Sequence, residues 1–259
     1  MKTLSIATQK GGVGKTTTAL EVAAAMSIEY GLKVLLVDFD QQQNLSTYVG
    51  VDPEECKTTI YDALHDPEKI HDAIIHLNLF DYIPGTSELS KCDVEFINPE
   101  DLFNLDDALD LVKDNYDYAI IDNGPQRGKT LQMTYVASDY IVAPCDDTKG
   151  GFDGIAQIHH DVERLKGART PLSSAVIIGA VLTRYKPNTI ISKTALDILT
   201  SIMGQINSKG FVMYVRETVK PSEAKLATKS MQEYAPYCNT SLDYKEVTKA
   251  ILEYAKGDK

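Results

Sequence analysis

The stretch TLSIATQKGGVGKTTTALEVAAAM, residues 3–26, decides the fold. Its apolar first residues predict a buried strand, its glycines a turn, and its Ala, Leu, Val and Met a helix. A strand, a glycine-rich turn and a helix in this order form a phosphate-binding loop, because backbone N–H groups and the helix dipole attract the anion. The Gly-Lys-Thr at residues 14–16 matches that motif, but Gln9 stands where its first glycine is normally found, and a second cation, Lys10, precedes the paired glycines. The sequence therefore predicts a polyphosphate site with one departure and one additional charge.

Apolar runs of strand length alternate with helix-length segments along the whole chain. The predicted strands are Leu4–Thr8, Lys33–Phe39, Phe80–Pro84, Tyr116–Asp122, Tyr140–Pro144, Ala175–Leu182 and Phe211–Val215. The predicted helices are Lys15–Tyr30, Thr59–Leu64, Pro67–His76, Pro99–Asp114, Lys129–Ala137, Gly151–Lys166, Ser192–Ile206, Pro221–Lys229 and Tyr244–Ala255. Strands such as KVLLVDF and YAIID are apolar nearly throughout, which is typical of a parallel sheet covered on both faces. We therefore expect an α/β fold with a doubly wound, mainly parallel sheet flanked by helices, and a single domain over residues 1–259.

Two predicted strands end in aspartates at the edge of the sheet where the phosphate loop lies. VLLVDFDQQQN carries Asp38 and Asp40, and YDYAIIDNGP carries Asp122. Carboxylates at the C-terminal ends of strands can hold a metal ion and orient water for hydrolysis. Either strand taken alone could instead use its aspartate to cap the next helix. Together with the loop they predict a phosphate site in which Lys15 contacts the phosphates and the Thr16 hydroxyl binds Mg²⁺.

Charge is distributed unevenly along the chain. The formal net charge of −11 argues, taken alone, against nucleic acid as a partner. Residues 1–170 contain 14 Lys and Arg against 29 Asp and Glu, whereas residues 171–259 contain 12 against 8. The C-terminal part could present a weak cationic face, although a solvated surface of mixed charge accounts for the same numbers.

The four cysteines lie far apart and lack the spacing of metal ligands, which is typical of reduced thiols in a cytoplasmic protein. The longest apolar stretch, AVIIGAVL at residues 175–182, is well below the roughly 20 residues that span a bilayer. The apolar run at the N-terminus is too short for the core of a secretory signal. We expect a cytoplasmic protein with no membrane insertion.

These motifs resemble those of the deviant Walker A ATPases of the ParA/Soj/MinD superfamily, and within it the ParA-type partition ATPases. KGGVGKTTT matches the signature loop, VLLVDFDQQQN is similar to D-x-D-P-Q-G-N, and YDYAIIDNGP is similar to I-I-D-x-P-P. ASDYIVAPCDDTKGGFDG and VRETVKPSEAKLATKS resemble later segments of the ParA branch, so the similarity covers nearly the whole chain. Three departures concern the switch geometry: Gln41 replaces a proline, Gln43 replaces a glycine, and Asn123-Gly124 replaces the residue and first proline after Asp122.

The resemblance implies a P-loop ATPase that works as an ATP-bound homodimer. Two subunits would close face to face around two ATP molecules, with Lys10 of each subunit reaching the phosphates of the other. An additional ammonium group beside the phosphates is strongly favoured in a water-poor interface. The residues implied to bind ATP are those of the loop: Lys10, Gly11, Gly12, Val13, Gly14, Lys15, Thr16 and Thr17.

The same resemblance assigns catalytic roles to Lys10, Lys15 and Asp40, with Asp40 orienting the attacking water. Thr16, Asp38 and Asp122 would hold Mg²⁺. No glutamate stands where a strong general base would be expected. We therefore expect slow intrinsic turnover that a partner accelerates.

The implied partners are duplex DNA, bound without sequence preference in the ATP state, and a ParB-type centromere-binding protein that triggers hydrolysis. The ATP-bound protein would then be associated with the nucleoid. Candidate DNA contacts are the lysines of the C-terminal part, Lys193, Lys209, Lys220, Lys225 and Lys229. Arg184 and Arg216 are weak candidates for contacts to adenine. The cargo stays open: a plasmid, a chromosome, an integrated element or a protein assembly.

Three other functions share parts of this pattern. One alternative is a MinD-like ATPase that positions a protein assembly on a membrane surface or nucleoid. Its membrane form needs a basic amphipathic C-terminal helix, and DYKEVTKAILEYAKGDK does place apolar residues on one face, namely Val247, Ile251, Leu252 and Ala255. Acidic residues dilute its positive charge, which favours packing onto the sheet. An iron–sulfur reductase of the nitrogenase type needs a bridging cysteine pair, for which Cys92 and Cys145 lack the glycine-rich context. A non-catalytic nucleotide-gated scaffold is disfavoured by the presence of Lys15 and Asp40.

Overall fold

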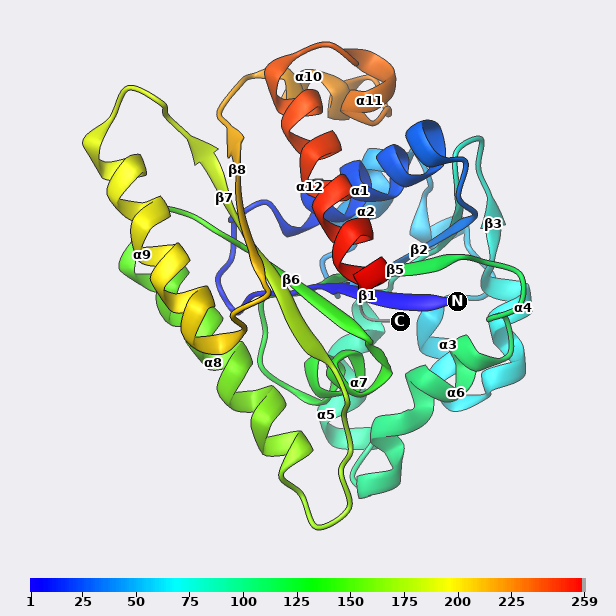
Figure 1. Cartoon of the computed structure of the whole chain (residues 1–259). Helices are drawn as coiled ribbons and strands as arrows, with labels where there is room; N and C mark the ends of the chain where they lie inside the picture. Colours follow the sequence, from blue (N-terminus) through cyan, green and yellow to red (C-terminus); the bar gives the residue numbers. More distant parts are fainter. Residues whose placement is uncertain (258–259) are drawn as a thin grey trace.

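The computed structural model describes residues 1–257, which form one eight-stranded sheet with helices on both faces (Figure 1). The strand order is β3-β4-β2-β5-β1-β6-β7-β8, and each neighbouring pair is parallel except β3 and β4. The strands are β1 Lys2–Ile6, β2 Val34–Phe39, β3 Ile75–His76, β4 Asp81–Ile83, β5 Tyr118–Asn123, β6 Tyr140–Cys145, β7 Val176–Tyr185 and β8 Phe211–Arg216. The predicted doubly wound, mainly parallel sheet is confirmed.

The α-helices follow the strands in the order expected of βαβ units. They are α1 Lys15–Tyr30, α2 Asn44–Val49, α3 Ile60–His65, α4 Ile70–Ala73, α5 Cys92–Glu95, α6 Asn104–Asp110, α7 Lys129–Ala137, α8 Lys149–Lys166, α9 Ile190–Ile206, α10 Lys220–Leu226, α11 Met231–Tyr234 and α12 Asn239–Gly257. Short 3₁₀ helices cover Pro53–Glu55, Pro67–Lys69, Ser87–Lys91 and Pro99–Phe103.

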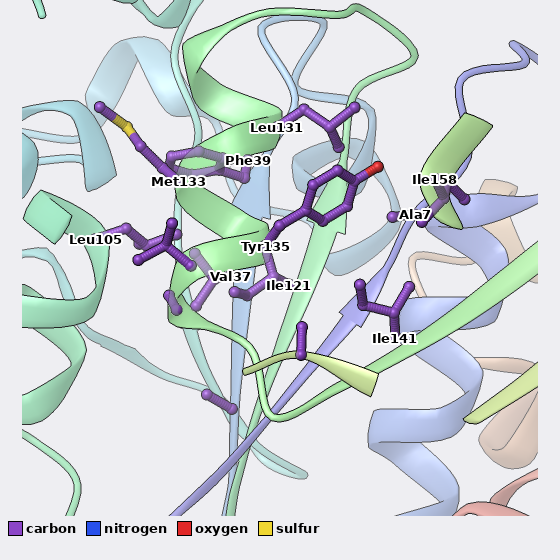
Figure 2. Close-up of a cluster of buried hydrophobic side chains, with 14 of the residues drawn as sticks. Ala7, Val37, Phe39, Leu105, Ile121, Leu131, Met133, Tyr135, Ile141 and Ile158 are labelled. Atoms are coloured by element: carbon purple, nitrogen blue, oxygen red, sulfur yellow. The ribbon is translucent and has the colours of Figure 1, made fainter. Parts of the chain in front are cut away.

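Each face of the sheet carries its own hydrophobic core, because successive residues of a strand point to opposite faces. On β2, Leu36 packs in the core that contains α1 and α12, whereas Leu35 and Val37 pack in the core that contains α3, α6, α7, α8 and α9. Figure 2 shows part of the second core, where Met133 and Tyr135 of α7 lie over Val37 and Ile121. Burial on both faces explains why these strands are apolar throughout.

Several predicted element boundaries are wrong. The helix predicted at Pro67–His76 is a 3₁₀ turn followed by α4, and residues 75–76 are the strand β3, which pairs with β4. The helix predicted at Pro99–Asp114 begins as a 3₁₀ turn and its α-helical part ends at Asp110. The short helices α2, α5 and α11 were not predicted. They contain four to six residues, too few to show helical periodicity.

Candidate nucleotide-binding site

The phosphate loop connects β1 to α1 at the centre of the sheet, where β1 lies between β5 and β6. This is the switch point at which open α/β sheets bind ligands. Gly12 and Gly14 have φ angles of +75° and +87°, a left-handed conformation that favours glycine. The loop and the first turn of α1 line a cavity of about 290 Å³, to which Gly11, Lys15, Thr16 and Thr17 also contribute. The cavity and the start of the helix fit a chain of phosphates.

Two hydroxyl groups hold this loop in place. The Thr183 hydroxyl at the end of β7 donates a hydrogen bond to the Val13 carbonyl at 2.9 Å. The Thr18 hydroxyl donates to the Gly14 carbonyl at 2.8 Å and lies 3.1 Å from the hydroxyl of Tyr244. The Val13 side chain is itself buried, so this residue can take part in nucleotide binding only through its backbone.

The two lysines of the loop point in different directions. Lys15 lines the cavity, is only 7% exposed, and donates from Nζ to the Lys10 carbonyl at 3.0 Å. Burial lowers the pKa of Lys15, against the opposing effects of Asp122 and Asp40. The Lys10 ammonium instead binds the Asp146 carboxylate at 2.7 Å and the hydroxyl of Thr148, which caps α8. Lys10 therefore does not serve the phosphate cavity of its own chain in this structure.

The aspartates predicted from the strand ends are adjacent in space. The register of β2 and β5 places Asp38 next to Asp122, and both side chains are fully buried. Burial, and next the neighbouring charge of Asp122, raise the pKa of Asp38 well above its usual value. Burial also raises the pKa of Asp122 to about 7, an effect that the nearby Thr16 hydroxyl opposes.

The environment of the Asp122 carboxylate is suited to a metal ion. Neither oxygen has a hydrogen-bond partner of good geometry, so the Thr16 contact is loose and the lone pairs are free. Within residues 1–257, no group of three or more His, Cys, Asp or Glu side chains could hold a metal ion by itself. Magnesium commonly binds through a hydroxyl, one or two carboxylates, waters and the substrate phosphates. The orphaned carboxylate beside Thr16 fits that kind of site.

Asp40 lines the phosphate cavity and is positioned there by its own loop. Its Oδ1 accepts a hydrogen bond from the Gln42 N–H at 3.0 Å, and its own N–H donates to Asp38 Oδ1 at 3.1 Å. Gln43, which replaces a glycine of the resembled motif, has a left-handed φ of +52°. A Cβ at Gly124 would lie 2.9 Å from Asp40 Oδ1, so the backbone approaches Asp40 closely there. The departures at residues 43 and 124 therefore border the predicted water-orienting carboxylate.

A larger cavity of about 950 Å³ adjoins the phosphate cavity and shares Gly14, Thr17 and Tyr48 with it. Its volume and position fit a nucleoside. Arg184 lines both cavities, has a left-handed φ of +55°, and has no side-chain partner within the described part of the chain. Arg216 lines the larger cavity but is held by Asp243, with a shortest distance of 2.6 Å. Arg184 is thus the better placed of the two predicted adenine contacts.

The structure does not gather the five lysines proposed for DNA into one patch. Lys193 and Lys209 lie near opposite ends of α9, which is about 25 Å long. Lys220 is paired with Glu223 at 2.7 Å, and Lys229 is exposed. Contrary to expectation, Lys225 lines both nucleotide cavities, and its ammonium lies 4.8 Å from the ring centroid of Tyr48.

Comparison with known proteins identifies the family. The AAA domain family matches residues 1–173. The chromosome partitioning protein ParA of Caulobacter vibrioides is 30% identical over 258 residues, which cover 97% of this chain and 94% of that protein. The chain belongs to the ParA family of partition ATPases. ATP hydrolysis is the activity of this family, and the resemblance read from the signature loop is confirmed.

Solved structures show the fold of this ParA-family protein independently. An ATP complex of McdA from Cyanothece aligns with a TM-score of 0.84 at 23% identity. The alignment covers 97% of this chain and 96% of the McdA chain. A plasmid partition protein from Borrelia burgdorferi bound to AMPPNP has a TM-score of 0.79 at 24% identity, and 98% of each chain is covered.

Sequence reasoning missed three residues of the site in this ParA-family protein. Asp146 and Thr148 hold Lys10, and Tyr48 lies between the two cavities under Lys225. Asp146 follows the end of β6, at the same edge of the sheet as Asp38 and Asp122, so its position after a predicted strand was a usable signal. Tyr48 lies on α2, a helix too short to be predicted.

Proposed function

We propose that this protein is a partition ATPase that forms an ATP-sandwich dimer, binds duplex DNA without sequence preference, and is reset by partner-stimulated hydrolysis. The observation that supports this most directly is the position of Lys10. Of the two loop lysines, only Lys15 lines the phosphate cavity of its own chain, whereas Lys10 is held outside it by Asp146. A loop lysine that does not reach its own phosphates is available for those of a second subunit.

Different residues of the site would bind the phosphates, hold the metal ion and orient the attacking water. Lys15 and the start of α1 bind the phosphates, and Thr16 and Asp122, with Asp38 behind them, would hold Mg²⁺. The bound ion would neutralise charge on the transferred phosphoryl group. Asp40 would orient water rather than act as a strong base, and we therefore propose slow intrinsic turnover. A ParB-type partner would accelerate it, and the cargo would be a plasmid or chromosome in the cytoplasm.

The membrane-surface alternative receives no support from the C-terminal helix. The apolar face of α12 is buried in the core shared with α1: Val247, Ile251, Leu252 and Ala255 are each at most 8% exposed. Within the described residues, none of the helices has the length and hydrophobicity required of a membrane span. We propose DNA as the surface to which the ATP dimer binds.

The proposal is tested by separating ATP binding, dimerisation and DNA binding. Lys15→Ala should abolish ATP binding, whereas Lys10→Ala should leave ATP bound to a monomer that no longer dimerises in light scattering. DNA retention should require ATP and fall steeply with salt, because phosphate contacts release counterions. The proposal would be contradicted if the Lys10→Ala variant dimerised with ATP as well as the unmodified protein does. DNA retention that is independent of ATP would also contradict it. The variant Lys33→Ala, which changes an exposed lysine outside the loop, serves as a control and should behave like the unmodified protein.

A further inference from the structure

A cavity of about 320 Å³ lies between α7 and α8, away from the nucleotide cavities. Leu131 and Tyr135 of α7 form one wall, and His160 and Arg164 of α8 form the other, in each case at the i, i+4 spacing of one helix face. Arg127, in the loop before α7, closes one side. None of these residues lines either nucleotide cavity. The cavity is therefore a separate site in the structure.

The Tyr135 hydroxyl is the most unusual group of this cavity. The side chain is fully buried, and its hydroxyl has no hydrogen-bond partner. Figure 2 shows the ring projecting from α7, with the hydroxyl in the region between Leu131 and Ile158. Burial raises the pKa of Tyr135, the negative charge of Asp161 raises it further, and Arg127 opposes the rise. All three residues line this cavity. A buried hydroxyl without a partner is rare in folded proteins, because it loses its hydrogen bonds to water without replacement.

The arginines of this cavity are incompletely paired. The Arg164 side chain makes no ion pair or hydrogen bond to any other residue in the described range 1–257. Arg127 has one partner, Asp161, at a long distance of 3.4 Å. The oxygen of Asp161 that faces Arg127 already accepts a shorter hydrogen bond from Gln9 Nε2 at 2.8 Å. The charged residues that line the cavity are thus two arginines and one carboxylate, so their formal charges sum to +1 before any contribution from His160.

We propose that this cavity binds an oxyanion, the carboxylate or phosphate group of a small organic ligand or a peptide. Arg127 and Arg164 would bind its oxygens, and Tyr135 would donate its unused hydroxyl proton to the same group. Guanidinium forks match the geometry of carboxylate and phosphate. A cationic ligand would be repelled by both arginines, and an apolar ligand would leave the Tyr135 hydroxyl without a partner. The helix dipole alone explains a basic residue in the last turn of α8, but it does not explain Tyr135.

The cavity is larger than a bare anion requires, and the side chain of Leu131 lines part of it. The ligand therefore carries the oxyanion on an organic group. This inference does not rest on the proposed function, because none of the residues that line this cavity also lines a nucleotide cavity.

Isothermal titration calorimetry of the full chain without nucleotide tests the proposal, with inorganic phosphate and N-acetylglutamate as separate probes. We expect saturable binding of at least one probe. Binding should be lost in Arg164→Gln and about tenfold weaker in Tyr135→Phe, since a hydrogen bond to a charged group is removed. The matched control Arg169→Ala, which removes an exposed arginine beyond the end of α8, should bind normally. Binding of phosphate alone would indicate a phosphorylated ligand, and binding of N-acetylglutamate alone an acidic side chain.

Two further measurements distinguish binding in this cavity from binding at the nucleotide loop and from a loss of folding. Lys15→Ala should keep the binding, because phosphate that occupies the nucleotide loop would be lost in that variant. Without a probe, Tyr135→Phe should melt no earlier than the unmodified protein, because the hydroxyl that it removes has no partner in the fold. The proposal is overturned if neither probe binds saturably, if binding depends on Lys15 rather than Arg164, or if Tyr135→Phe binds both probes normally.

Discussion

Neutralising Asp146 should strengthen ATP-dependent dimerisation. In the structure the Lys10 ammonium binds the Asp146 carboxylate at 2.7 Å and the Thr148 hydroxyl, so it must leave both before it can reach a second subunit. Burial alone would raise the pKa of Asp146, but the hydrogen bonds from Lys10 and Thr148 lower it. The pair therefore stabilises the state in which Lys10 is withheld. Asp146→Asn keeps the shape of the side chain and removes its charge.

The size of the effect follows from the exposure of the pair. The side chains of Lys10 and Asp146 are 29% and 19% exposed, so solvent screens their interaction only partly. A hydrogen bond to a charged group contributes about 1 kcal/mol more than a neutral one. A symmetric dimer must break two such pairs, which gives about 2 kcal/mol, or a roughly 30-fold lower dimer dissociation constant.

Sedimentation analysis with a non-hydrolysable ATP analogue measures this constant directly. ATP binding to the monomer should be measured in parallel, so that a change in nucleotide affinity is not read as a change in dimerisation. Asp110→Asn is the matched control, because it neutralises another Lys–Asp pair, to Lys113 at 2.8 Å, that is remote from the loop. A dimer constant that is unchanged or higher in Asp146→Asn, with ATP still bound, would refute the reasoning.

Three further predictions concern backbone strain, a buried acid and a close contact. Gln43→Gly should raise the free energy of unfolding by about 0.5–1 kcal/mol in urea titrations. The left-handed conformation destabilises the folded state of a residue with a Cβ, and relief of this strain exceeds the entropy that a glycine gains in the unfolded chain. Burial raises the pKa of Glu21 in α1 to about 8 from 4.5. Its stabilising contribution is complete below pH 4.5 and is lost as the pH rises through 8, so the protein should lose roughly 3–5 kcal/mol over this range. Glu21→Gln should remove the share of this slope that Glu21 contributes, whereas Asp38 and Asp122, whose pKa values are also raised, should keep the remainder. An unchanged pH dependence in that variant would contradict the argument. Gly124→Ala should lower ATPase activity about tenfold or more, since its Cβ would meet the carboxylate of Asp40, whereas Gly204→Ala, which meets no atom within 4 Å, should retain full activity.

The strands and the loop could be predicted because their signals are local. An apolar run predicts a buried strand, and the glycines of the loop predict the turn before α1. Helix-length segments between the strands predict α1 and α7 with their observed bounds. The strand β3 could not be predicted in this way, because its two residues form a strand only by pairing with β4. Pairing between segments is a property of the fold and leaves no periodicity in the chain.

The same distinction applies to the site. The loop residues and the strand-end aspartates follow from motif spacing, and parallel register then brings Asp38 and Asp122 together. Asp146 also follows a predicted strand, but its contact with Lys10 could not be predicted, because that contact depends on the position of β6 beside β1. The position of Lys225 at the cavities could not be predicted for a related reason. Its charge suggested DNA, but the packing of α10 against α2 turns it toward the nucleotide cavities.

The one departure of the loop from the strict phosphate-binding pattern and the additional cation beside it both make contacts with α8 or the turn before it. Gln9, in the place of the first glycine, donates from Nε2 to Asp161 in the middle of α8, and Lys10 binds Asp146 and Thr148 at its start. A glycine at position 9 would lack the side chain that makes the first of these contacts. Lys10 therefore does not duplicate Lys15, since Lys15 lines the phosphate cavity while Gln9 and Lys10 hold the loop against α8 and its preceding turn. A movement of the loop would therefore have to break these contacts or move α8 and its preceding turn with it.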